Sequence, residues 1–119
     1  MIPFTEYNNN KNLDCHFIHA NGFPPNAYKT FLSLLNNKFQ IKAPLLRPHW
    51  KDYNKVDDFS DWDLFLDDFI RYCNENNINQ SYGIGHSIGG NILIRACLQN
   101  KTLFKSIVLL DPTIFIPTI

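Results

Sequence analysis

The stretch that most constrains this fold is SYGIGHSIGGNILI, residues 81–94, which holds four of the chain's five glycines. An apolar, strand-like segment leads directly into a G-x-S-x-G motif centred on Ser87, and a helix-like segment follows it. This is the setting of a nucleophile elbow, in which a serine stands on a strained turn between a strand and a helix. Gly85 and Gly89 would avoid side-chain collisions in such a turn, and Gly90 would let the helix pack closely on the sheet. The pattern therefore predicts that the hydroxyl of Ser87 is presented at the C-terminal edge of a sheet.

The same turn would place a backbone amide where it can bind negative charge. Ile88 would begin the helix, and the N–H groups there point outward at the positive end of the helix dipole. An acyl-transfer site needs two such donors converging on one oxygen. The loop HANGFPP, residues 19–25, follows another predicted strand, and its small residues would let the backbone approach a ligand. We expect this loop to provide the second donor; an ordinary Pro/Gly turn is the alternative.

The elements alternate along the chain as strand, helix, strand, helix, strand, helix, strand. This order is typical of an α/β fold with a mostly parallel sheet flanked by helices. The strands are predicted at 15–20, 39–46, 81–85 and 105–111. The helices are predicted to begin at Asn26 as an N-cap, near Ser60 and at Ile88, and the polar segment 8–12 is predicted to be a loop.

The composition of the 119 residues is that of one globular domain. Lys and Arg number 11 and Asp and Glu number 11, so a formal net charge of zero gives no reason to expect nucleic acid or an anionic membrane as partner. No apolar run reaches the roughly 18 residues of a membrane span, and the N-terminus lacks the pattern of a signal peptide. Cys15, Cys73 and Cys97 form no CxxC pair. We expect free thiols, no metal site, no cofactor and a cytoplasmic location.

These motifs resemble the N-terminal half of an α/β-hydrolase-fold serine hydrolase, from about Cys15 to Pro112. HANGFPP is similar to the family's His-Gly-x oxyanion loop after strand three, and GHSIGG is similar to the elbow after strand five. Residues 109–112, LLDP, match the end of strand six, whereas the family's Asp-x-Arg-Gly-x-Gly motif is matched in RPH mainly by its arginine. The resemblance implies that Asn21, with Phe23 as an alternative, supplies the second oxyanion N–H beside that of Ile88.

The resemblance is incomplete at the catalytic base and acid. The family order is Ser, then Asp or Glu, then His. No histidine follows the elbow, because the four in the chain are His16, His19, His49 and His86. His16 and His19 are expected to be structural, and His49 is the candidate for a substitute base. Asp111 stands where a minority of members place the catalytic acid; a cap on the strand end is the alternative.

The resemblance implies a single domain over residues 1–119, truncated at its C-terminus and lacking the later strands and the lid. A sheet of about four parallel strands would expose an edge, which predicts self-association or a partner supplying the rest. The expected function is hydrolysis of a carboxylic ester or related acyl substrate through a Ser87 acyl-enzyme, with Asp111 as acid and a histidine from outside the chain as base. The alternatives are a non-catalytic remnant that binds a small ligand or partner, and an acyltransferase or haloperoxidase of the same fold. Phe23, Tyr28 and Trp50 are candidates for an apolar pocket or for core packing.

Overall fold

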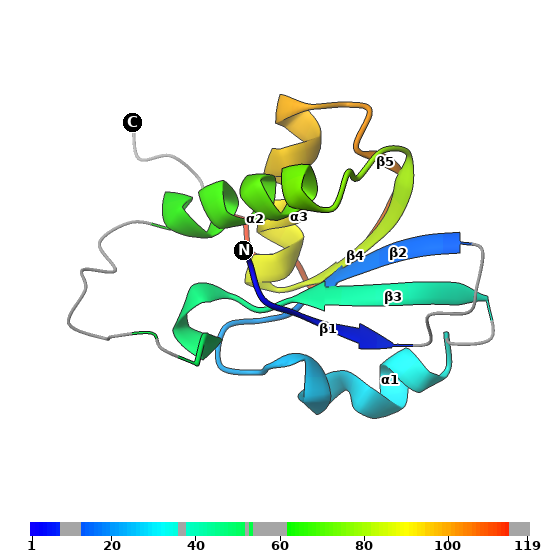
Figure 1. Cartoon of the computed structure of the whole chain (residues 1–119), viewed down its shortest axis with the longest axis vertical. Coiled ribbons are helices and arrows are strands. Elements are labelled where there is room, and N and C mark those ends of the chain that lie inside the picture. Colours follow the sequence, from blue (N-terminus) through cyan, green and yellow to red (C-terminus); the bar gives the residue numbers. More distant parts are fainter. Residues whose placement is uncertain (8–12, 36–37, 52, 54–61, 115–119) are drawn as a thin grey trace.

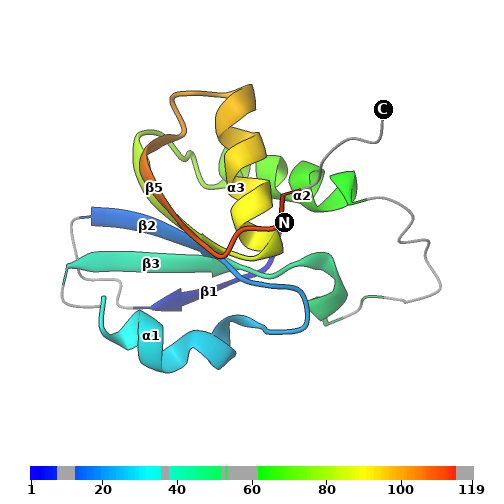
Figure 2. The same cartoon turned by 180° about the vertical axis from the view of Figure 1, so that it is seen from behind.

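The computed structural model describes residues 1–7, 13–35, 38–51, 53 and 62–114. Its sheet has five strands in the order β1-β3-β2-β4-β5, with helices on both faces (Figures 1 and 2). The strands are β1 (Phe4–Tyr7), β2 (Leu13–Ile18), β3 (Phe39–Pro44), β4 (Ser81–His86) and β5 (Phe104–Leu110). The helices are η1 (Pro25–Tyr28), α1 (Lys29–Ser33), η2 (Arg47–His49), α2 (Asp63–Glu75) and α3 (Ile88–Gln99). This is the mostly parallel α/β architecture predicted from the order of elements; the segment 8–12 and Ser60 lie outside the described residues.

Strand β1 adds a fifth strand, which the sequence did not predict, to the four parallel strands that it did. It runs antiparallel to β3, with Phe4 opposite Pro44 and Tyr7 opposite Ile41. The strand is only four residues long, which is too short for an alternation of apolar and polar residues to be recognised. Its pairing with β3, which is distant in sequence, fixes its conformation.

The parallel strands bring the two motif-bearing loops together. Strands β2 and β4 are neighbours, and Ile18 at the end of β2 pairs with Gly85 near the end of β4. Because the carboxyl ends of parallel strands meet at one edge of the sheet, the loop that begins at His19 and the turn at Ser87 leave the sheet side by side.

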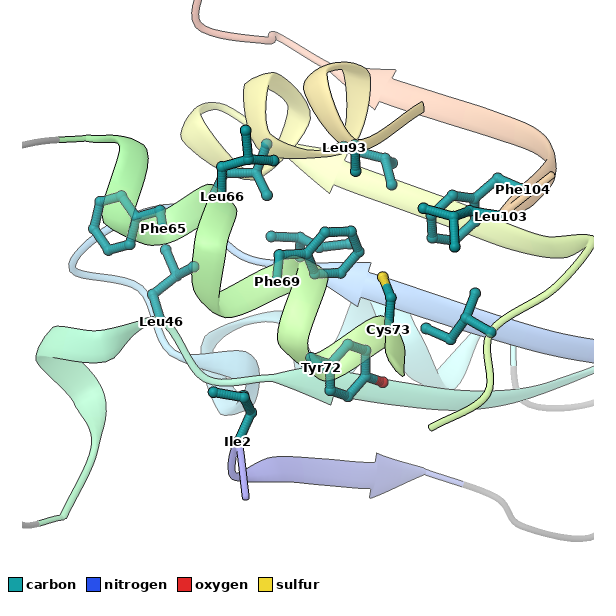
Figure 3. Packing of buried hydrophobic residues seen from close by; sticks show 14 of the residues in the cluster. Ile2, Leu46, Phe65, Leu66, Phe69, Tyr72, Cys73, Leu93, Leu103 and Phe104 are labelled. Atoms are coloured by element: carbon teal, nitrogen blue, oxygen red, sulfur yellow. The ribbon is translucent and has the colours of Figure 1, made fainter. Parts of the chain in front are cut away.

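Two apolar clusters cover the two faces of the sheet. On one face, α2 and α3 pack over the sheet around Tyr72, Phe69 and Phe104, and the last two rings stack with centroids 6.2 Å apart (Figure 3). On the other face, Leu32 of α1 packs among buried residues of β2 and β3, including Phe17. The sheet is therefore covered on both sides along its centre, as a parallel sheet requires.

The helix predicted to begin at Asn26 is shorter than expected and starts later. Residues 25–28 form a 3-10 turn, and Tyr28 is the N-cap of α1 without a side-chain capping bond. The Asn26 side chain instead accepts a hydrogen bond of 3.2 Å from the Tyr7 hydroxyl. The prediction of an Asn26 cap is wrong because Asn26 lies inside the 3-10 turn rather than directly before α1.

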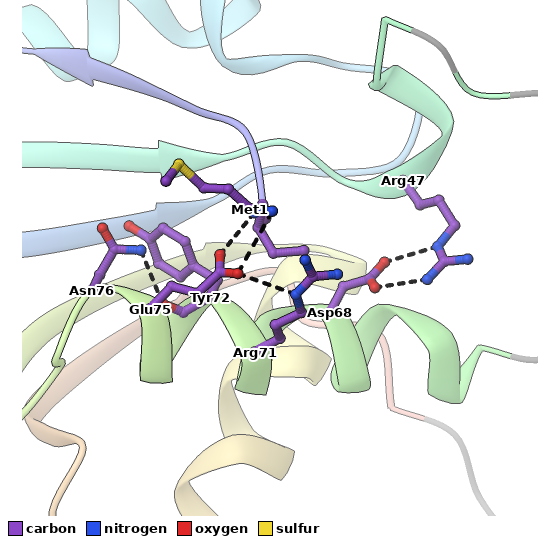
Figure 4. A network of polar contacts seen from close by, with 8 residues as sticks. Met1, Arg47, Asp68, Arg71, Tyr72, Glu75 and Asn76 are labelled. Atoms are coloured by element: carbon purple, nitrogen blue, oxygen red, sulfur yellow. Dashed lines mark hydrogen bonds and ion pairs between the residues drawn. The ribbon is translucent and has the colours of Figure 1, made fainter.

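Polar contacts tie α2 to other parts of the chain (Figure 4). Arg47, directly after the segment that follows β3, donates two hydrogen bonds to the Asp68 carboxylate at 3.0 and 2.8 Å. The backbone N–H of Ile2 donates to Glu75 at 2.7 Å, near the end of the helix. The arginine that matched the family motif therefore contacts α2 and holds the loop after β3 against it.

Strand β5 forms one edge of the described sheet, beside β4 alone. Its Val108 is 51% exposed and pairs with Ile84 of β4. Self-association through this edge stays a prediction. Among the described residues, no helix combines the length and apolar character that crossing a bilayer would need.

Candidate functional site

Ser87 occupies the turn between β4 and α3 in a strained backbone conformation. Its φ is 55° and its ψ is −119°, and it is the N-cap of α3. A positive φ is rare for a residue with a side chain and costs on the order of 1–3 kcal/mol where the surrounding structure holds it. The Ser87 N–H donates to the carbonyl of Leu110 in β5 at 3.0 Å, which fixes the turn against the neighbouring strand. The Ser87 side chain is half-buried.

The three glycines around Ser87 lie where a Cβ would meet other atoms. A Cβ on Gly85 would lie 2.6 Å from the carbonyl oxygen of Gly89, and one on Gly89 would lie 2.1 Å from the carbonyl oxygen of Ile18. A Cβ on Gly90 would lie 2.9 Å from Pro112. The strand, the new helix and the end of β2 thus approach one another so closely that only glycine fits at the first two positions.

The loop after β2 begins with a tight turn from Ala20 to Phe23. The N–H of Phe23 donates to the carbonyl of Ala20 at 3.1 Å, and Gly22 has a φ of 88°. Asn21 does not have a positive φ. The turn therefore combines a negative φ at its second residue with a positive φ at its third. This combination is that of a type II turn, which explains the glycine.

Most backbone amides of this turn already have partners. Ala20 donates to the Tyr28 hydroxyl at 3.0 Å, Gly22 donates to Nε2 of His49 at 3.1 Å, and Phe23 donates within the turn. The N–H of Asn21 has no partner among the residues that the structure describes. Of the two alternatives from the sequence, Asn21 therefore has the available amide and Phe23 does not.

The N–H of Ile88, at the start of α3, also has no hydrogen-bond partner within the part of the chain that the structure describes. Ile88 is the first residue of α3, where N–H groups have no partner within the helix. The neighbouring Gly89 lies close to the end of β2, since a Cβ there would be 2.9 Å from the carbonyl oxygen of His19. The start of α3 therefore packs against the start of the loop that contains Asn21.

The segment after β5 contacts the elbow at a residue that sequence reasoning missed. The hydroxyl oxygens of Thr113 and Ser87 are 3.1 Å apart, and the N–H of Thr113 donates to the Ser87 carbonyl at 3.0 Å. No local sequence pattern marks this contact, because the two residues are 26 positions apart in the chain. Asp111, in the same segment, is exposed and has a φ of 44°.

None of the chain's four histidines has a hydrogen bond to Ser87. His16 lies between Asp14 and the Tyr72 hydroxyl, at 2.7 and 2.6 Å. Nδ1 of His86 lies 2.8 Å from the Tyr28 hydroxyl, and Nε2 of His49 accepts from Gly22. The expected structural role of His16 agrees with its burial in this network. His49 contacts the loop rather than the serine, and its role as a substitute base stays a hypothesis.

His19 joins the ends of two strands through both ring nitrogens. Its Nδ1 lies 2.7 Å from the carbonyl of Ala20, so it must carry the proton, and Nε2 accepts from the N–H of Leu46 at 3.0 Å. This pattern requires a neutral imidazole. The pKa of His19 is lowered from 6.5 to about 4, mainly by burial and to a smaller extent by the nearby His49.

The neutral His19 predicts a loss of stability in acid. In the unfolded chain His19 takes up a proton below its pKa of 6.5, whereas in the folded chain it does so only near about 4. Between pH 6.5 and about 4 the unfolded state binds more protons than the folded state. The contribution of His19 to the free energy of unfolding is therefore complete above pH 6.5 and is lost as the pH drops to about 4. We expect His19 to account for a loss of about 3 kcal/mol across this window. Urea unfolding of the wild type and of His19→Gln over the same range measures it; an identical pH dependence in both would contradict it.

The aromatic residues considered for a pocket have different surroundings. Phe23 is 59% exposed, and the ring of Tyr28 packs on Phe17 with centroids 4.6 Å apart. Trp50 donates from its indole to the carbonyl of Leu45 at 2.8 Å and packs against the core on the α2 side. Within the described residues, no group of His, Cys, Asp and Glu could hold a metal ion.

Comparisons with known proteins identify the architecture. No family model matches the sequence, and no curated protein matches it. Solved structures do match. A carboxylesterase of Nitrososphaera gargenis superposes with a TM-score of 0.79 at 23% identity over 93% of this chain and 41% of its own. An α/β hydrolase fold protein from Burkholderia ambifaria has a TM-score of 0.81 at 15% identity, covering 96% and 41%.

A probable hydrolytic enzyme from Pseudomonas aeruginosa gives a TM-score of 0.77 at 15% identity, over 92% of this chain and 36% of its own. The chain thus spans well under half the length of these three structures. Their sequence identities to this chain are too low to show more than a shared architecture. The order of the strands, the elbow between β4 and α3 and these superpositions together show that the chain has the α/β-hydrolase fold, of which it holds a part.

Proposed function

We propose that this chain carries the nucleophile and the oxyanion donors of a serine hydrolase that acts on carboxylic esters or related acyl compounds. The observation that carries the proposal is the backbone of Ser87, whose φ of 55° places a half-buried serine directly before a helix N-terminus. Such strain is kept where the surrounding structure imposes it, and it concentrates at active sites. The N–H of Asn21 on the adjacent loop, which has no partner among the described residues, supports the same assignment.

In the proposed reaction, Ser87 Oγ attacks the carbonyl carbon and gives up its proton to a base. The carbonyl oxygen becomes an oxyanion that accepts hydrogen bonds from the N–H groups of Ile88 and Asn21. The base then returns the proton to the leaving alkoxide, which departs as an alcohol, and Ser87 is left as an ester. Attack by water on that ester, with the same proton transfers, releases the acid and restores the serine.

The base in this proposal is a histidine from outside the 119 residues, since none of the four within them has a hydrogen bond to Ser87, and His49 is the alternative within the chain. Asp111 is proposed as the acid that orients it, from its place at the end of β5 beside the elbow. The same histidine contacts favour a second candidate, a non-catalytic domain that binds a small acyl ligand or a partner.

A fluorophosphonate probe separates the two candidates, with imidazole added as a diffusible general base. We expect imidazole-dependent labelling of the wild type, its loss in Ser87→Ala, and no change in Ser106→Ala, which removes an exposed hydroxyl on β5. Labelling is read by intact-protein mass. Folded wild-type protein that stays unlabelled, or labelling that survives in Ser87→Ala, would favour the non-catalytic domain.

A further inference from the structure

The hydroxyl of Tyr28 makes hydrogen bonds to both halves of the candidate site. It accepts from the N–H of Ala20 at 3.0 Å and lies 2.8 Å from Nδ1 of His86. The oxygen accepts from Ala20 and can donate its own proton to Nδ1 when the His86 ring carries its proton on Nε2. Each partner directly precedes a residue of the proposed site, since Ala20 precedes Asn21 and His86 precedes Ser87.

The ring of Tyr28 is held in place independently of its hydroxyl. It makes an edge contact with Phe17, whose side chain is fully buried, at 4.6 Å between centroids. It makes a second edge contact with the ring of His86 at 5.6 Å. Burial raises the pKa of Tyr28, so the hydroxyl keeps its proton at neutral pH and can donate. The packed ring thus holds the hydroxyl in place, and this hydroxyl forms hydrogen bonds with both the loop after β2 and the turn after β4.

The sequence alone does not fix the distance between the two loops. They follow different strands, and backbone pairing of β2 with β4 reaches only as far as Ile18 and Gly85. Beyond that pair, Gly89 packs against the carbonyls of Ile18 and His19. The side-chain link between the two loops runs from Ala20 to His86 through the Tyr28 hydroxyl. The contact of Gly22 with His49 holds the far side of the turn but reaches no part of the elbow.

We propose that Tyr28 is a positioning residue that sets the Asn21 amide relative to Ser87 by tying the residue before each to one hydroxyl. This inference rests on the proposed function, in which the Asn21 N–H binds the oxyanion. Tyr28 itself touches neither substrate nor the reacting atoms. Its loss therefore changes the rate of reaction at Ser87 rather than the binding of the probe, because misplacement of an oxyanion donor acts in the transition state.

Tyr28→Phe keeps the ring and removes only the hydroxyl. Tyr82→Phe is the matched control, because Tyr82 packs against Phe39 in the same apolar cluster and its hydroxyl has no hydrogen bond among the described residues. The tie is read without any reaction, from hydrogen exchange at the Ala20 amide and from the ¹⁵N shifts of the His86 ring. In Tyr28→Phe we expect exchange about 10-fold faster at Ala20 and loss of the single Nε2–H tautomer at His86. Tyr82→Phe should change neither.

The consequence for the site is read from fluorophosphonate labelling with imidazole. We expect the maximal labelling rate to fall by roughly 10-fold to 100-fold in Tyr28→Phe, with the half-saturating probe concentration unchanged. Unchanged exchange at Ala20 would overturn the tie, and an unchanged labelling rate despite faster exchange would overturn its positioning role. Wild-type protein that takes no label would end the proposed function and this role with it, while the exchange data would still report the tie.

Discussion

Gly89→Ala is expected to destabilise the fold by more than about 3 kcal/mol, which is near the upper end of single-residue effects. A Cβ at this position would lie 2.1 Å from the carbonyl oxygen of Ile18 and 2.6 Å from its carbonyl carbon. Both atoms belong to the backbone of β2, so relief requires the start of α3 to move away from the sheet. Such a movement would also displace Ser87, which is two residues earlier, and we expect the variant to lose the elbow as well as stability.

Gly83→Ala provides the matched control in the strand before the same turn. A Cβ there would meet the Leu93 methyl groups at 3.0 and 3.1 Å and the Phe104 ring at 3.1 Å. These are side chains that can shift, so we expect a cost of only about 1–2 kcal/mol. Urea unfolding followed by circular dichroism measures both variants. Equal losses would contradict the claim that the backbone contact between α3 and β2 limits this turn to glycine.

Asn21→Pro is expected to slow fluorophosphonate labelling of Ser87, assayed with imidazole, by about 100-fold to 1,000-fold, as loss of one oxyanion donor does. Proline removes the N–H that has no partner among the described residues. Position 21 is the second residue of the turn closed by Phe23 and Ala20, with Gly22 at a φ of 88° as the third. Proline is favoured at the second position of a type II turn, so the loop should keep its shape.

Asn21→Ala distinguishes the amide from the side chain. It keeps the backbone N–H and removes only the carboxamide, and we expect its labelling rate to stay within about 3-fold of the wild type. Similar losses in both variants would assign the effect to the side chain. An Asn21→Pro protein that is labelled as fast as the wild type would remove Asn21 from the proposed site.

The parts of the fold that local patterns specify could be predicted from the sequence. The four parallel strands, the long helices α2 and α3 and the turn at Ser87 each have a signal within one short segment. The need for glycine on both sides of Ser87 could be predicted from the sequence because the strain at a strand-to-helix turn is local. A Cβ at Gly89 or Gly90 would clash with Ile18 or Pro112. These two residues belong to other segments, so the clashes could be identified only from the fold.

Features that depend on distant pairings were missed or misjudged. Strand β1 forms by pairing with β3, and Asn26 lies inside a 3-10 turn, where its side chain contacts Tyr7 of β1. The aromatic ring of Tyr28 predicts a place in a pocket or in the core, whereas its hydroxyl hydrogen-bonds to two loops that are adjacent only in the folded chain. Thr113 reaches Ser87 in the same way. Hydrogen bonds between distant segments leave no periodic pattern in a sequence.

A crystal structure of the phosphonylated protein tests the central claim most directly. The account predicts phosphorus bonded to Ser87 Oγ, with the phosphonyl oxygen about 2.7–3.1 Å from the backbone nitrogens of both Ile88 and Asn21. A phosphonyl group on another residue would contradict the account. So would a phosphonyl oxygen on Ser87 that points away from these two amides.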